Sequence, residues 1–164
     1  MFGLFKSSKE KEIESEVTVF GKILFQQISG VRDKAYAGIL DKDDLKTRIN
    51  SMYAAGYLIG YVDEVLNYLG VSESSKGKHA NRVFEGIFPG AGSSLVKSKL
   101  AARRLGASIS PETTNYSQVY IGCAEFDIGI STGQIEALKI TANRNERPTL
   151  LAQYLTNGEI GEID

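Results

Sequence analysis

The chain has 164 residues, of which 42% are hydrophobic and 24% are charged, and its formal net charge at pH 7 is −1. This length is typical of one domain and is sufficient to bury a core without disulfides or a structural metal. The single cysteine and single histidine exclude an internal disulfide and any metal site that needs several such ligands. We therefore expect one domain over residues 1–164, with loose termini at 1–8 and 158–164 and with neither metal nor cofactor.

The N-terminal sequence MFGLFKSSKEKE places its apolar residues before its lysines, which is the reverse of a secretory signal. The uncharged run from Met52 to Val62 is too short to cross a bilayer, which requires about 20 apolar residues. These two features predict a cytoplasmic protein with no transmembrane segment.

The first predicted helix is amphipathic. Its apolar residues recur at helical spacing, at Ile13, Val17, Phe20, Leu24 and Ile28. Four glutamates between positions 10 and 16 lie near its start, where the helix dipole favours negative charge. Gly30 is the expected end of this helix.

The strongest pattern is a long central helix over about residues 43–69, which is apolar on nearly every side in its second half. Acidic residues from Asp41 to Asp44 supply the N-cap and the first turn, and Gly70 fits the C-terminal cap. Small residues at 54–56 and at Gly60 leave its backbone open to close approach by a neighbour. We expect the other helices to pack around this one.

One face of this helix carries four tyrosines at helical spacing, Tyr53, Tyr57, Tyr61 and Tyr68. Tyrosine has a large ring and a polar tip, so such a stripe suits either the internal core or a partner-binding interface. An exposed stripe would be larger than the apolar patches that monomers usually tolerate, and pairing would bury it. The interface interpretation therefore predicts a partner-binding surface at these tyrosines and a two-fold homodimer.

The rest of the chain also has helical signals. After a linker at 71–77, helices are expected over 78–87, from Ser93 or Ser94 to Leu105, from Ser110–Pro111 through Phe126 and past Gly133, and after Pro148. Strand signals are nearly absent. The sequence therefore predicts an all-α domain of six or seven helices.

Charge is distributed unevenly along the chain. Residues 71–110 contain seven Lys or Arg and two Asp or Glu, whereas residues 111–164 contain three and eight. The two blocks either neutralise each other or form a nucleic-acid-binding surface in the 76–104 region, and the residues that would contact phosphate include Lys97, Lys99, Arg103 and Arg104.

Two short motifs resemble ligand-binding motifs, one for DNA and one for an anion. Residues 100–110, LAARRLGASIS, resemble the first helix and turn of a helix-turn-helix motif, but Pro111 and Glu112 fall where the second helix needs apolar residues. Residues 88–94, FPGAGSS, place glycines and hydroxyls before a helix start, where an anion can bind, yet lack the Lys of a phosphate-binding loop. In both places the sequence favours an ordinary interhelical turn.

Few groups are suited to catalysis. Asp63 lies beside the small-residue face of the central helix and is a candidate acid or base, alone or with His79. Cys123 lies in an apolar stripe next to Glu125, which disfavours a reactive thiolate. The sequence thus predicts a non-enzymatic interaction module with no catalytic residues, such as an adaptor, regulator or inhibitor of a cytoplasmic protein. A nucleic-acid-binding protein and a small enzyme with a site near Asp63 are the alternatives.

Overall fold

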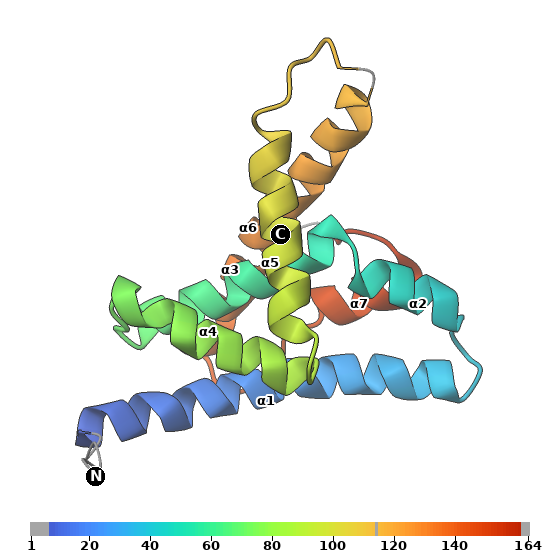
Figure 1. Cartoon of the computed structure of the whole chain (residues 1–164). Helices are drawn as coiled ribbons and strands as arrows, with labels where there is room; N and C mark the ends of the chain where they lie inside the picture. The colour runs from blue at the N-terminus through green and yellow to red at the C-terminus, as the bar shows by residue number, and fades with distance from the viewer. Residues whose placement is uncertain (1–6, 114, 162–164) are drawn as a thin grey trace.

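The computed structural model describes residues 7–113 and 115–161, and this part of the chain is all-α (Figure 1). Its seven helices are α1 (Ser8–Tyr36), α2 (Lys42–Ile49), α3 (Met52–Tyr68), α4 (Glu73–Ile87), α5 (Gly92–Gly106), α6 (Tyr116–Ala142) and α7 (Leu150–Asn157). The all-α prediction is confirmed. Of the expected loose ends at 1–8 and 158–164, residues 1–6 and 162–164 lie outside the described residues, and Ser8 is the first residue of α1.

Helix α1 buries the predicted apolar stripe and is longer than predicted. The Ser7 side chain caps it by accepting a hydrogen bond from the backbone N–H of Glu10. Gly30 does not end the helix, because Val31 and Ala35 extend the buried stripe by almost two more turns. The helix ends after Tyr36, where Gly38 takes a positive φ of 74°.

The predicted helix over 43–69 is divided into α2 and α3. The hydroxyl of Ser51 accepts a hydrogen bond from the N–H of Ala54 at 3.0 Å, so Ser51 is the N-cap of a new helix. The expected end is correct, because Gly70 follows α3 with a φ of 65°. Helix α3 is the central element, and 11 of its 17 residues are buried.

Two other helix starts differ from the prediction. Helix α4 begins at Glu73 instead of 78, so the expected linker at 71–77 is mostly helical. Helix α6 begins at Tyr116 rather than near Pro111, because the N–H of Thr113 donates to the carbonyl of Ser110 at 3.0 Å in a turn.

Helices α3 and α6 form the closest helix pair in the fold, and glycines on both helices allow it. A Cβ added at Gly56 or Gly60 of α3 would collide with the backbone carbonyl groups of Phe126 or Ile130 in α6. A Cβ at Gly133 of α6 would lie 2.7 Å from the backbone nitrogen of Tyr61 in α3. Only glycine fits at these places, so backbone packs directly against backbone along α3 and α6.

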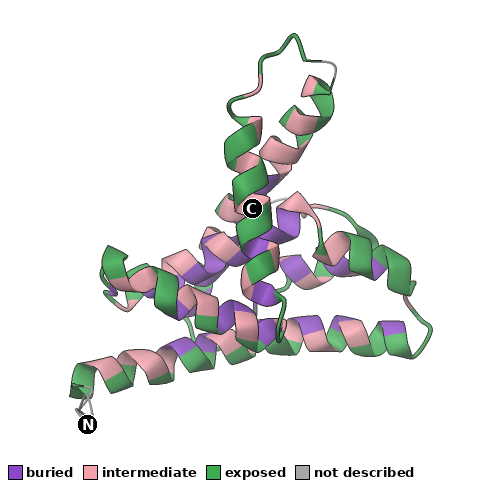
Figure 2. Cartoon of the chain, in the orientation of Figure 1, coloured by how far each residue is buried: buried purple, intermediate pink, exposed green. Residues whose placement is uncertain are grey.

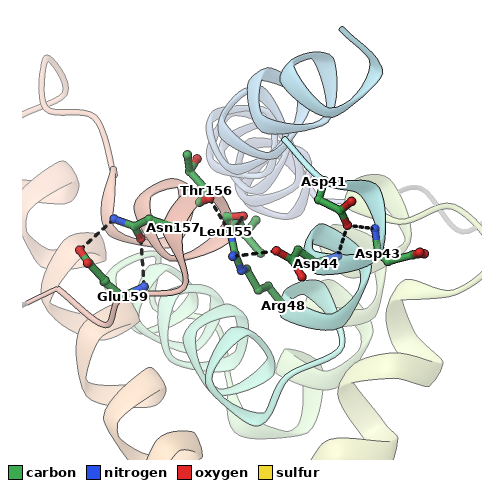
Figure 3. A network of polar contacts seen from close by, with 8 residues as sticks. All are labelled: Asp41, Asp43, Asp44, Arg48, Leu155, Thr156, Asn157 and Glu159. Carbon is green, nitrogen blue, oxygen red and sulfur yellow. Dashed lines mark hydrogen bonds and ion pairs between the residues drawn. The ribbon is translucent and has the colours of Figure 1, made fainter. Parts of the chain in front are cut away.

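Helix α7 is attached at both ends by side chains from other helices. The buried carboxylate of Glu136 in α6 accepts hydrogen bonds from the N–H groups of Thr149 and Leu150 at the N-terminus of α7. At the other end, Arg48 of α2 donates to the carbonyls of Leu155 and Thr156 (Figure 3). The two ends of α7 are thereby fixed to α6 and α2.

Buried residues are concentrated on α1, α3 and the second half of α6, with others on α4 and α7, whereas the second half of α5 and the first half of α6 project beyond the other helices (Figure 2). We call this projection the α5–α6 arm. No helix of the described residues is both long and apolar enough to cross a membrane.

Candidate interaction surface

Three of the four tyrosines predicted to bind a partner lie in the protein core. Tyr53, Tyr57 and Tyr61 are at most 1% exposed, and the ring of Tyr53 lies 4.5 Å from the ring of Tyr154 in α7. Only Tyr68, at the end of α3, is half-exposed. The stripe therefore serves internal packing, which is one of the two interpretations that the sequence left open. The interface interpretation is wrong for Tyr53, Tyr57 and Tyr61, because α6 and α7 cover this face.

The tyrosine stripe surrounds a buried carboxylate that the sequence analysis did not identify. Glu136 is 6% exposed and accepts a hydrogen bond from the hydroxyl of Tyr57 at 2.5 Å. Burial raises the pKa of Tyr57 well above its ordinary value, and the nearby negative charge of Glu136 raises it further. Glu136 also accepts hydrogen bonds from the N–H groups at the start of α7, so its role is structural. The sequence signal for this role is a single carboxylate among the apolar residues of α6.

The residues proposed for catalysis do not form a site. The carboxylate of Asp63 lies 3.1 Å from the ammonium group of Lys76, and His79 is buried in α4. Four surface cavities have volumes between about 280 and 390 Å³, and neither residue lines any of them. They lie between α1 and α4, between α1 and α2, between α5 and α6, and between α1 and the end of α3. Among the described residues no three His, Cys, Asp or Glu side chains gather as a metal site would need.

Several basic residues of the 76–104 region are paired with acids of the same chain. Arg103 makes a two-pronged contact with the carboxylate of Asp127 in α6, at 2.9 and 2.7 Å, which raises the pKa of Arg103. Arg82 pairs with Glu14 of α1. Lys97 and Arg104 are exposed, and Lys99 is partly exposed. The charge blocks thus partly neutralise each other. Of the four residues predicted to contact phosphate, Arg103 is already paired with the carboxylate of Asp127.

The glycine-rich turn before α5 is occupied by a carboxylate from the preceding helix. Glu85 accepts hydrogen bonds from the N–H groups of Gly90 and Ser93, both at 2.9 Å. Hydrogen bonds from the backbone N–H and the side chain of Ser93, together with that from the N–H of Gly90, lower the pKa of Glu85. This internal anion takes the place that an external phosphate would need.

The α5–α6 arm is held together at its base by the Arg103–Asp127 contact and by close packing of Gly106 against Cys123. Other large side chains of the arm are open to solvent. Leu105 is 68% exposed, and Tyr120 is 61% exposed with its ring 6.0 Å from that of Tyr116.

A continuous apolar surface runs along α6 on the side opposite α3. We call it the α6 outer face, and its residues are Tyr120, Ile121, Ala124, Ile128, Ser131, Ile135 and Leu138. These residues project from one side of the helix, since they recur at steps of three and four. Ile121, Ile128 and Leu138 are 56%, 44% and 51% exposed.

Charged side chains are confined to the edges of the α6 outer face. Asp127 lies at one edge, where it is paired with Arg103, and Glu125 and Lys139 lie at the other. An uncharged, largely apolar strip about five turns long is unusual for a solvent-facing helix and is typical of a contact surface. This face was not recognised from the sequence, where Cys123 indicated an apolar stripe on another side of the helix.

No family model matches this chain, and neither the curated proteins nor the solved structures contain a significant match.

Proposed function

We propose that this protein is a non-enzymatic helical interaction module that binds a protein partner through the α6 outer face. The observation that carries the proposal is the exposed apolar strip from Ile121 to Leu138, on a helix whose opposite side is packed against α3. A helix with two apolar sides buries one of them in its own fold and leaves the other for a second molecule.

The chemistry of this surface favours a macromolecular partner over a small molecule. The α6 outer face is long, and its polar groups are few and do not converge on a point, whereas small-molecule sites are concave with a few convergent polar groups. An amphipathic helix or a shallow apolar groove on another protein matches its shape and chemistry. In the cell the module would act as an adaptor, regulator or inhibitor, and the cytoplasm is the proposed location.

The glycine packing behind the α6 outer face supports this role. Because α6 lies in backbone contact with α3, its outer face is held on a rigid support, and little conformational entropy is lost when a partner binds. The hydrogen bonds from Glu136 to α7 fix α6 further.

The proposal is tested by capturing partners from native-host extract with wild-type protein and with two variants. Ile128→Glu places a charge at the middle of the α6 outer face, and Ile39→Glu places the same charge at an exposed position after α1. A partner retained by wild type and by Ile39→Glu, and lost by Ile128→Glu, would support the proposal. Equal recovery by both variants, with unchanged helix content, would contradict it.

A further inference from the structure

We infer that the α6 outer face pairs with the same face of a second copy of this chain, with the two α6 helices antiparallel. The inference rests on the proposed function and names the partner. Its core is the row Ile121, Ala124, Ile128, Ser131, Ile135 and Leu138, which occupies the two seam positions of a heptad repeat over nearly three heptads. Such a row is the pattern that one helix presents to another along a coiled-coil seam.

The spacing along this row reads the same in both directions, at three, four, three, four and three residues. A reversed copy therefore matches it layer by layer. Ile121 lies opposite Leu138 of the second copy, and Ala124 lies opposite Ile135. The central layers place Ile128 opposite Ser131, next to the two-fold axis.

The sizes of the side chains favour the antiparallel over the parallel arrangement. In the antiparallel pair, both small residues face a large one, so the layers interdigitate without gaps. In a parallel pair, Ala124 would face Ala124 and Ser131 would face Ser131, which leaves two thin layers between bulky ones. The alternation of large and small residues thus selects one orientation.

Charge at the edge of the α6 outer face also favours the antiparallel orientation. Glu125 and Lys139 follow seam residues by one position, so they lie on the same edge of the helix. In the antiparallel pair, Glu125 lies level with Gln134 of the second copy and Lys139 lies level with Tyr120, so no like charges face each other. In a parallel pair each of these residues would lie level with the same residue of the second copy, and like charges would repel.

The exposed apolar area is close to the apolar share of a stable interface. Tyr120, Ile121, Ile128 and Leu138 are between 44% and 61% exposed, and together they present roughly 400 Å² of largely apolar surface per copy. An interface of standard size buries about 800 Å² per partner, slightly more than half of it apolar. The α6 outer face supplies most of that apolar share.

The test is the mass of the purified full-length chain by light scattering, at concentrations up to about 100 μM. Wild type should reach twice the monomer mass of 17.9 kDa, and so should the Ile39→Glu control. Ile128→Glu should be monomeric with the circular dichroism of wild type. A monomeric wild type, or a dimer that Ile128→Glu does not split, would overturn the inference.

Cysteine cross-linking tests the orientation in a chain whose own Cys123 is replaced by alanine. The double variant Ala124→Cys, Ile135→Cys should oxidise to a covalent dimer, because the antiparallel pair places these positions in one layer. Within one chain they are 11 residues apart and too distant to join. Ala124→Cys alone should stay unlinked, and efficient linkage of that single variant would exclude the antiparallel pair.

A monomeric wild type that still captures another protein through Ile128 would overturn the second copy as partner and leave the proposed function intact.

Discussion

Gly60→Ala should destabilise the fold although alanine favours helix formation, because Gly60 lies in backbone contact with α6. An added methyl carbon would lie 2.8 Å from the Cα and the carbonyl carbon of Ile130 and closer still to its oxygen, whereas ordinary contacts begin near 3.4 Å. Backbone cannot rotate aside as a side chain can, so α3 and α6 must separate by about 1 Å along the most closely packed pair in the fold.

The magnitude follows from two opposing terms. Overpacking of this kind costs up to about 3 kcal/mol or somewhat more, and alanine recovers about 1 kcal/mol of helix propensity. We therefore expect a net loss of about 2 kcal/mol in the free energy of unfolding, measured by urea denaturation followed by circular dichroism.

Gly30→Ala is the matched control. Gly30 also lies within a helix, but an added Cβ there would meet no atom within 4 Å. The same substitution should stabilise the protein by about 0.5–1 kcal/mol. If Gly60→Ala were as stable as wild type, or gained as much as Gly30→Ala, backbone contact between α3 and α6 would not be what orders these helices.

Three further predictions concern the attachment of α7 and the buried tyrosines. Tyr57→Phe removes the hydroxyl donor to the Glu136 carboxylate and should cost about 1.5–3 kcal/mol in urea denaturation, and a neutral result would mean that this bond adds nothing. Arg48→Met keeps much of the side-chain length but loses the bonds to the last carbonyls of α7, so amide hydrogen exchange should accelerate in α7 while that in α3 is unchanged. Burial raises the pKa of Tyr57 and Tyr61 above the ordinary value of 10.0, so the folded chain keeps protons that the unfolded chain releases. Stability present below about pH 10 should therefore be lost as the pH rises further, and Tyr61→Phe should reduce that loss in urea midpoints at pH 9 and 11.

The helical class and most helix positions could be predicted from local patterns. The α1 stripe, the apolar α3 and the capping function of Gly70 each depend on residues close together in sequence. The break at Ser51 was visible in principle, since serine is a strong N-cap, but the apolar residues on both sides obscured it.

The pairing of α3 with α6 could not be predicted in the same way. Gly56 and Gly60 indicated a close neighbour, but nothing local shows that the glycines of α6 are the matching surface. The same long-range contact decides the candidate site. It helps to bury Tyr53, Tyr57 and Tyr61, so these tyrosines are not available to a partner. We therefore propose the opposite side of α6 as the partner-binding surface instead.

The most direct test of the central claim is a photo-reactive amino acid placed at position 128, compared with the same residue at position 39, in the native host. Both positions are exposed, but only Ile128 lies on the α6 outer face. We predict a specific protein adduct at position 128, containing either a second copy of the chain or another protein, and none at position 39. Absence of any adduct at position 128, or the same adducts at both positions, would contradict the assignment of the α6 outer face as the binding surface.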